Sequence, residues 1–212
     1  PASCEAGTYL DSASDACVGC PAGSVCAGGA SQPRPCRRGG YCAANSSQPT
    51  DCPAGRYGSE PGLSNASCSG ECAPGYFCEA GSVSAKAAPC AEGTFGNGSG
   101  FVSQSGCTTC DEGHACREAA TAMRSCTPGT VQPQAGQGTC ASCIAGTFIN
   151  ASGATACLEC VAGSFCEEGA SAPLPCPGGT HKNASLSVMS SVEQCVDCPA
   201  GTSCSVGSAE AT

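Results

Sequence analysis

Twenty-four cysteines among 212 residues constrain this chain more than any other feature of its sequence. With four tyrosines, five phenylalanines and no tryptophan, it cannot build the hydrophobic core that ordinary domains of this length need. Such a composition is typical of secreted scaffolds in which disulfides take the place of a core. A Gly/Ser/Ala-rich chain without these cysteines would instead favour disorder.

The cysteines divide into two kinds of ring that use all 24 with none left over. Short modules, with the spacing C-x5-C, run from Cys20 to Cys26, Cys36 to Cys42, Cys72 to Cys78, Cys110 to Cys116, Cys160 to Cys166 and Cys198 to Cys204. Long modules run from Cys4 to Cys17, Cys52 to Cys68, Cys90 to Cys107, Cys126 to Cys140, Cys143 to Cys157 and Cys176 to Cys195.

The order of the modules, numbered 1 to 12 along the chain, predicts the disulfide pairing. It reads long, short, short, long, short, long, short, long, long, short, long, short. One short module directly follows another, and two long modules are adjacent. With this irregular order, disulfides across module boundaries would leave some cysteines without a partner. We therefore predict that each cysteine pairs within its own module, and that each ring stabilises the fold by about 2–3 kcal/mol.

Every module carries a glycine three residues after its first cysteine, which we call the turn glycine. The twelve are Gly7, Gly23, Gly39, Gly55, Gly75, Gly93, Gly113, Gly129, Gly146, Gly163, Gly179 and Gly201. The recurring C-P-A-G predicts a tight turn with proline second and glycine fourth. Two residues further on stands an aromatic residue in seven modules, which we expect to form a miniature core beside the disulfide. These are Tyr9, Tyr41, Tyr57, Phe77, Phe95, Phe148 and Phe165.

The expected fold class is small and disulfide-rich: an elongated tandem array of stapled modules with short β-ladders and little other regular structure. A helical turn is expected at most in residues 117–125, and modules that meet only their neighbours should form a rod. Grouping the modules gives segments 1–51, 52–89, 90–125, 126–175 and 176–212. The last segment stops where a further cysteine is due, so we expect the chain to be part of a longer array.

Two stretches carry a family resemblance. CPAGSVCAGGASQPRPC (20–36) and CVAGSFCEEGASAPLPCPGGT (160–180) resemble the ephrin-receptor-like cysteine-rich repeats of large surface proteins in protists, algae and animals. The long module CPAGRYGSEPGLSNASC (52–68) is similar to the first loop of tumour-necrosis-factor-receptor cysteine-rich domains. The resemblance covers essentially the whole chain and implies an extracellular repeat fold more than a function. Similar repeats in algal mastigoneme proteins imply a flagellar surface as one location.

The asparagines independently indicate secretion. All five lie in N-x-S sequons, whereas about one would be expected by chance. We predict N-glycans at Asn45, Asn65, Asn97, Asn150 and Asn183. Ordinary turn asparagines are the alternative interpretation, and Asn45, which lies in a linker, is the weakest candidate.

Charge and motifs exclude several classes of function. The net charge is −9, so nucleic acid is not an expected partner, and no apolar run is long enough to span a bilayer. No catalytic motif and no unpaired cysteine is present, so we expect no enzyme and no cofactor. The CxxC pairs suggest zinc or dithiol chemistry, but each joins two different rings.

Two weaker ionic candidates remain. His114 lies beside Asp111 and Glu112 and could act as an acid–base group, although a solvated turn is the favoured interpretation. The DSASD stretch at residues 11–15 offers two carboxylates for calcium without an EF-hand spacing, so we expect no metal.

The function expected first is structural: a glycosylated, stapled rod within an extracellular fibre, coat, wall or flagellar-surface appendage. Its partners would be further copies of itself or other surface glycoproteins. The alternative is a ligand-binding ectodomain of a receptor or adhesin. Binding surfaces favour aromatic residues and arginine, and the candidates outside the repeated aromatic position are Tyr76, Phe101 and the cluster Arg34, Arg37 and Arg38.

Overall fold

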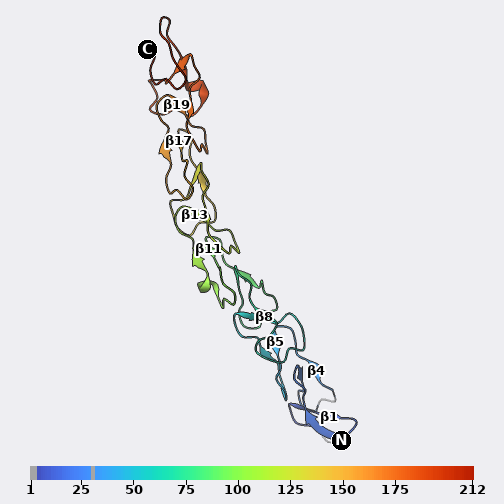
Figure 1. Cartoon of the computed structure of the whole chain (residues 1–212). Helices are drawn as coiled ribbons and strands as arrows, with labels where there is room; N and C mark the ends of the chain where they lie inside the picture. Colours follow the sequence, from blue (N-terminus) through green and yellow to red (C-terminus); the bar gives the residue numbers. More distant parts are fainter. Residues whose placement is uncertain (1–3, 30–31) are drawn as a thin grey trace. The chain divides into compact units, whose positions relative to one another are not determined.

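The computed structural model describes residues 4–29 and 32–212. Over these residues the regular structure consists of two-stranded sheets and two single-turn 3-10 helices, η1 (Gln104–Gly106) and η2 (Val192–Gln194) (Figure 1). The fold class is the predicted one, small disulfide-rich modules in tandem.

Each sheet pairs the two residues that follow a turn glycine with the two that precede the next module's first cysteine; in β1 and β2 the pairing runs further. The pairs are β1 (Thr8–Asp11) with β2 (Ala16–Gly19), β3 (Ser24–Val25) with β4 (Arg34–Pro35), β5 (Gly40–Tyr41) with β6 (Thr50–Asp51), β7 (Arg56–Tyr57) with β8 (Gly70–Glu71), β9 (Tyr76–Phe77) with β10 (Ala88–Pro89), β11 (Thr94–Phe95) with β12 (Thr108–Thr109), β13 (His114–Ala115) with β14 (Arg124–Ser125), β15 (Thr130–Val131) with β16 (Ala141–Ser142), β17 (Thr147–Phe148) with β18 (Leu158–Glu159), β19 (Ser164–Phe165) with β20 (Leu174–Pro175) and β21 (Thr180–His181) with β22 (Val196–Asp197).

The helical turn expected in residues 117–125 is absent. This stretch forms a turn, an isolated bridge from Ala120 to Phe95, and strand β14. Its backbone is recruited by the preceding module, which outweighs the helix propensity of its alanines.

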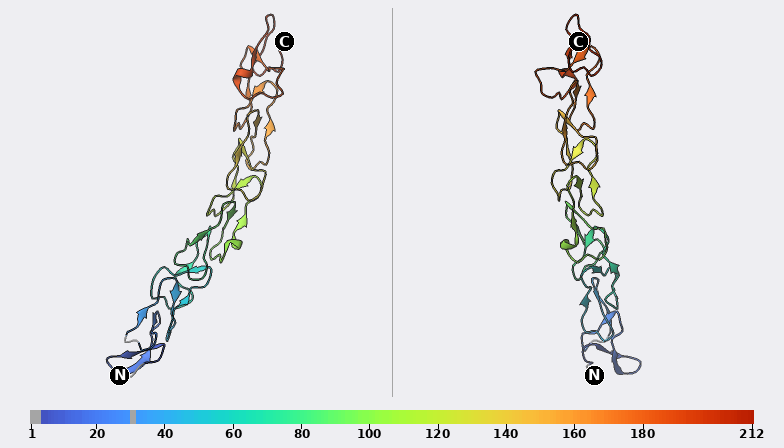
Figure 2. Two further views of the ribbon diagram at one scale, coloured as in Figure 1. Left: turned by 180° about the vertical axis from the view of Figure 1, so that it is seen from behind. Right: turned by 60° about the vertical axis from the view of Figure 1, so that its left-hand side comes forward.

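The chain divides into two compact units. The first comprises Pro1–Ala91, Phe95–Thr108 and Glu118–Ala122, and the second comprises Glu92–Thr94, Thr109–Arg117 and Met123–Thr212. Within each unit, consecutive modules follow one another end to end in chain order (Figure 2). The grouping of modules into five segments stays a sequence-based prediction.

Twelve disulfides join the cysteines within their modules, as the spacing predicts. Their Cα–Cα distances run from 5.6 Å in Cys4–Cys17 to 6.2 Å in Cys110–Cys116, within the usual range for disulfides. The chain is therefore closed into rings of two sizes, and no bridge crosses from one module to another.

The turn beside each first cysteine is shifted by one residue from the prediction. In module 2 the amide of Ser24 donates to the carbonyl of Pro21, so the turn spans Pro21–Ser24 and Gly23 is its third residue. Gly23 has a φ of 85°, which a type II turn requires at that position and which glycine adopts without strain. All twelve turn glycines have a positive φ.

One backbone hydrogen bond recurs at all eleven junctions between consecutive modules. The amide of each module's first cysteine donates to the carbonyl of the preceding module's turn glycine, over 2.8–3.0 Å. A second bond runs the other way in ten of the eleven junctions, from the turn-glycine amide to the carbonyl six residues after the next first cysteine. Modules are thus joined by main-chain groups, which every sequence supplies.

A second left-handed position links ten of the eleven modules from 2 to 12 to the module before. In a short module this position lies nine residues after the first cysteine, and in a long module it lies ten residues after it. The amide at this position donates to the carbonyl of the first cysteine of the preceding module over 2.8–3.0 Å. We call its occupant the left-handed residue. The ten are Gly29, Asn45, Gly62, Gly81, Gly100, Ala119, Gly136, Gly153, Gly169 and Gly207, all with positive φ.

The left-handed residue also reaches the second module back. A β-carbon built on Gly7 would overlap the carbonyl oxygen of Asn45, and one built on Gly129 would overlap that of Gly169. Nine of the twelve turn glycines have such a neighbour. The expectation that modules meet only their immediate neighbours is therefore wrong, because one left-handed peptide contacts two preceding modules.

The buried side chains are mainly sulfur. In the described part of the first unit every buried hydrophobic residue is a cysteine, and the repeated aromatic residues there are only half-buried. The second unit adds two small clusters, one around Val131 and Ile149 and one around Phe165 and Met189. Of the seven aromatic residues predicted to form miniature cores, only Phe165 is buried; Phe148 in the second unit is half-buried like those of the first, where the disulfides and turn glycines occupy the interior.

Module 11 replaces part of the backbone pattern with an apolar contact. Its ring has no left-handed residue at the expected position, and the amide of Gly163 lacks the bond that the other turn glycines of modules 1 to 11 make. Met189 fills the ring instead, 1% exposed and packed on Phe165. In this longer ring a buried apolar side chain thus takes the place of the two backbone hydrogen bonds.

Replacing turn glycines with alanine separates backbone strain from crowding. Gly129 and Gly179 have nearly the same φ, 86° and 87°, but a β-carbon at Gly179 meets nothing within 4 Å. We expect Gly179→Ala to reduce the free energy of unfolding by about 1–2 kcal/mol through strain. Gly129→Ala should reduce the free energy of unfolding by about 1–3 kcal/mol more than Gly179→Ala, because its β-carbon would overlap the Gly169 carbonyl. Urea unfolding with intact disulfides measures both, and equal losses would contradict the three-module contact.

Candidate functional site

The CxxC pairs do not form metal or dithiol sites. Cys17 is bonded to Cys4 and Cys20 to Cys26, so the two cysteines of this pair carry no thiol. Among the described residues, no group of three or more histidine, cysteine, aspartate or glutamate side chains is placed to hold a metal ion. A helix long and apolar enough to cross a membrane is likewise not found in residues 4–29 and 32–212.

The DSASD stretch forms the loop of the β1–β2 hairpin. The Asp11 carboxylate accepts hydrogen bonds from the Ser14 hydroxyl (2.7 Å) and amide (3.2 Å), and Asp15 has a φ of 50°. The hydrogen bond from the Ser14 hydroxyl, followed by that from the Ala13 amide, lowers the pKa of Asp11 below its ordinary value of 3.8. These bonds give the Asp11 carboxylate a role in shaping the loop.

His114 lies in strand β13 opposite Ser125 and is half-buried. Its Nδ1 lies 2.9 Å from the backbone carbonyl of Glu112, to which the protonated nitrogen would donate. The ring therefore contacts the backbone of Glu112, and its half-buried place in a strand differs from the solvated turn that the sequence favoured.

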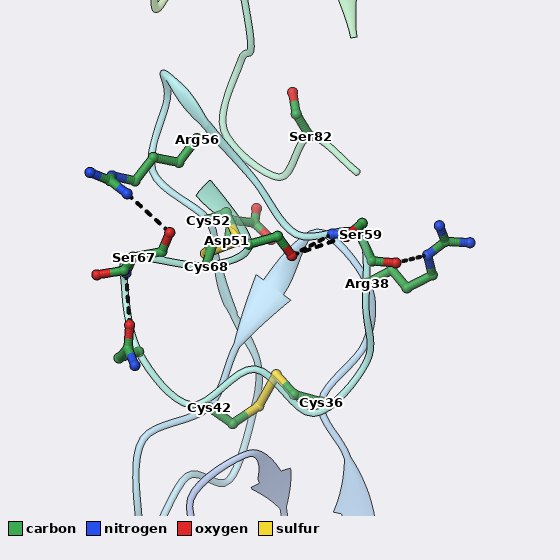
Figure 3. The surroundings of a disulfide bond; sticks show 12 residues. Cys36, Arg38, Cys42, Asp51, Cys52, Arg56, Ser59, Ser67, Cys68 and Ser82 are labelled. Carbon is green, nitrogen blue, oxygen red and sulfur yellow. Dashed lines mark hydrogen bonds between the residues drawn. A yellow bond between two sulfur atoms is a disulfide. The ribbon is translucent and has the colours of Figure 1, made fainter. Parts of the chain in front are cut away.

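The basic cluster predicted from residues 34–38 is divided among different contacts. Arg37 forms an ion pair with Asp51, and the Nε of Arg38 donates to the carbonyl of Ser59 in module 4 (Figure 3). Arg34 stands apart in strand β4, opposite Val25. Arg38 thus joins modules 3 and 4, and Arg37 is held by the linker strand β6 that precedes module 4, which weakens the prediction of a binding cluster.

A similar contact closes module 4. Arg56 donates to the Ser67 carbonyl over 3.1 Å, within the ring closed by Cys52 and Cys68 (Figure 3). It also donates to Glu71 over 3.3 Å. Sequence reasoning did not single out Arg56. Its position opposite Glu71 in β7 and β8 was the available signal, because facing residues of opposite charge attract each other.

The two aromatic candidates also contribute to packing. Phe101 forms a parallel bridge with Phe77, and a β-carbon on Gly96 or Gly106 would crowd its ring. Tyr76 is half-buried, with the Lys86 ammonium 5.7 Å from its ring centroid. Phe101 is therefore a packing residue, contrary to its prediction as an exposed anchor, because the long ring folds it back onto glycines.

The sequons occupy different environments. Asn65, Asn97 and Asn150 are exposed and Asn183 is half-buried. In Asn65 and Asn183 the side-chain oxygen accepts a hydrogen bond from the amide of the sequon serine over 3.0 Å, an Asx turn that does not use the side-chain nitrogen. Three sequons, at Asn97, Asn150 and Asn183, lie at one equivalent place, seven residues after the first cysteine of a long module.

Asn45 is also the left-handed residue of module 3. Its φ is 64°, and its side-chain oxygen lies so near Gly19 that a β-carbon there would be 2.2 Å from it. Asparagine tolerates this conformation better than other residues with a β-carbon, so the backbone alone gives a reason for Asn45. Its sequon therefore supports glycosylation less strongly than the other four.

No protein-family model matches this chain, and no curated protein matches it.

The hairpin loop should depend on pH through Asp11. Since the pKa of Asp11 is lowered by folding, its contribution to stability is complete above 3.8 and is lost as the pH falls through the lower, folded-state value. We expect the Ser14 amide to lose protection from hydrogen exchange on acidification, and this dependence to vanish in Asp11→Ala. An unchanged pH dependence in the variant would assign the effect to another group.

The glycan prediction can be tested site by site. Asn45, Asn65, Asn97 and Asn150 are all exposed, but only Asn45 has a left-handed backbone and a side chain against Gly19, so intact-glycopeptide mass spectrometry of the secreted protein should find the lowest occupancy at Asn45 and high occupancy at the other three. Five bare asparagines would contradict the prediction.

Proposed function

We propose that this chain is a segment of an extracellular structural glycoprotein, a stapled array of modules that contributes to a fibre, coat, wall or flagellar-surface appendage. The observation that carries the proposal is the backbone hydrogen bond from first cysteine to turn glycine at all eleven junctions. A contact that recurs at every junction suits a structural protein that is built by adding one module after another.

The disulfides indicate the compartment in which the protein works. Twelve disulfides leave no cysteine free, which indicates an extracellular or secreted protein, since cytosolic thiols are kept reduced. The array needs no large core, because each ring is closed covalently and each junction uses main-chain groups. Such modules can be added or omitted without redesigning their neighbours.

The alternative role, a receptor or adhesin that binds protein, loses most of its candidate anchors. Arg37 and Arg38 are engaged in contacts near the junction of modules 3 and 4, and Phe101 is packed on glycines. Protein interfaces draw much of their energy from aromatic and arginine side chains that are available to a partner. This observation favours the structural role.

Further copies of the chain or other surface glycoproteins are the proposed partners. Glycans on the sequons would make lateral surfaces polar, so association would rely on many weak contacts that act together. We propose no catalytic role for the chain and no bound cofactor.

Imaging the full-length native protein tests the structural role. We expect electron microscopy to show extended particles that assemble into filaments or a coat, and single particles to associate weakly when diluted. A compact monomer that binds one soluble protein ligand tightly, with no assembly at any concentration, would favour the receptor role instead. The disulfide-reduced protein serves as the control, because it should neither extend nor assemble.

A further inference from the structure

A cavity of about 310 Å³ lies in the second unit, between the β13–β14 sheet and the ring of module 8. Two arginines and several hydroxyl groups line it, with backbone and disulfide atoms behind them. The side chains that matter chemically are Arg117, Arg124, Ser125, Thr127, Thr130 and Thr139. Small-molecule sites range upward from about 300 Å³, so the cavity has room for a small ligand such as a sugar ring.

The charge of this cavity is opposite to that of the chain. The net charge is −9, yet two of the eight basic residues line the cavity and no acidic residue does. Other cations are already engaged: Arg37 with Asp51, Arg56 with Glu71 and Lys86 over Tyr76. No ion pair is formed by Arg117 or Arg124 among the residues that the structure describes. Their charges are available to an anion.

The hydroxyl groups add a second kind of recognition. The Thr130 hydroxyl donates to the backbone carbonyl of Thr127 over 2.7 Å, so its oxygen can only accept a further hydrogen bond. Ser125 and Thr139 can each donate or accept. A ligand with several hydroxyl groups would therefore find acceptors and donors beside the two guanidinium groups.

We propose that this cavity binds an acidic saccharide, a sugar that carries a carboxylate or a sulfate. Arginine matches the planar, two-oxygen geometry of a carboxylate and also binds the oxygens of a sulfate, and the threonine and serine hydroxyls match ring hydroxyls. A nucleotide fits less well, because no aromatic side chain lines the cavity to stack on a base. The site would attach the array to an acidic polysaccharide surface.

This inference does not rest on the structural role, because a receptor ectodomain could use the same cavity. Its test is a binding measurement on the intact chain, which reports on the cavity whether or not the protein assembles. Failure of one proposal therefore leaves the other standing.

Arg34 provides a matched control. Like Arg124, it is exposed, lies two residues before the first cysteine of a module and occupies the second strand of a two-stranded sheet. It does not line the cavity. Arg34→Gln thus removes the same charge from an equivalent place in a different module.

Calorimetric titration at low salt should use an oligogalacturonate, a sulfated galactose disaccharide, a neutral galactose oligomer and inorganic sulfate. We expect the two acidic sugars to bind, the neutral oligomer not to bind, and inorganic sulfate to bind more weakly. Arg117→Gln and Arg124→Gln should each weaken binding on the order of tenfold, and Arg34→Gln should leave it unchanged. Added salt should weaken binding of the wild-type chain.

Several results would overturn the proposal. If neither acidic sugar binds, the cavity is not a saccharide site. If the neutral oligomer binds as tightly as the acidic sugars, the two arginines do not determine the affinity. Inorganic sulfate that binds as tightly as the sugars would make this a simple anion site. If Arg34→Gln weakens binding as much as Arg124→Gln does, the affinity depends on the net charge of the chain and not on the arginines of the cavity. Far-ultraviolet circular dichroism and disulfide mapping would confirm that each variant is folded.

Discussion

The hydrogen bond from a module's first cysteine to the preceding turn glycine is the contact on which the rest of the structure depends. The turn glycine whose carbonyl accepts this bond has a positive φ in every module, a conformation that glycine adopts without strain. The disulfide then closes the ring directly beside this bond. Covalent and main-chain constraints meet at one residue, and side chains have a smaller role than in a globular domain.

This arrangement explains why so little apolar area is sufficient. In ordinary small domains a core compensates for the entropy lost on folding, and domains without one need staples. Here each ring restricts the unfolded chain before folding begins, and the left-handed residue brings a peptide against two earlier modules at once. The second unit adds apolar clusters at Ile149 and Met189, where its rings have room for larger side chains.

Much of the fold could be predicted from the sequence, because cysteine spacing and the turn glycine are local signals. The pairing of Cys36 with Cys42, for example, follows from module order alone. The left-handed position was missed although most of its occupants are glycines, because its distance from the first cysteine alternates between nine and ten residues. Its role also depends on contacts among three modules, which no single module displays.

The candidate sites were less predictable, because their residues depend on long-range neighbours. Arg38 looked like part of a basic cluster until the fold placed the Ser59 carbonyl beside it, and Phe101 looked exposed until its ring folded onto Gly96. Conversely, Arg117 and Arg124 carry no motif, and only the fold shows that they line one cavity. Charge along a sequence indicates which groups exist, whereas contacts decide which of them are available.

Amide hydrogen exchange of the oxidised protein, followed residue by residue with NMR, would show whether the junction hydrogen bonds hold the modules together. We expect slow exchange for the first-cysteine amides of modules 2 to 12 as a group, and faster exchange for Gly163 than for Gly146, whose amide donates to the Cys166 carbonyl at 2.7 Å. If the first-cysteine amides exchange as fast as those of exposed loop residues such as Ser64 while all disulfides are intact, the modules are held by their disulfides alone and the junction hydrogen bonds do not stabilise the fold.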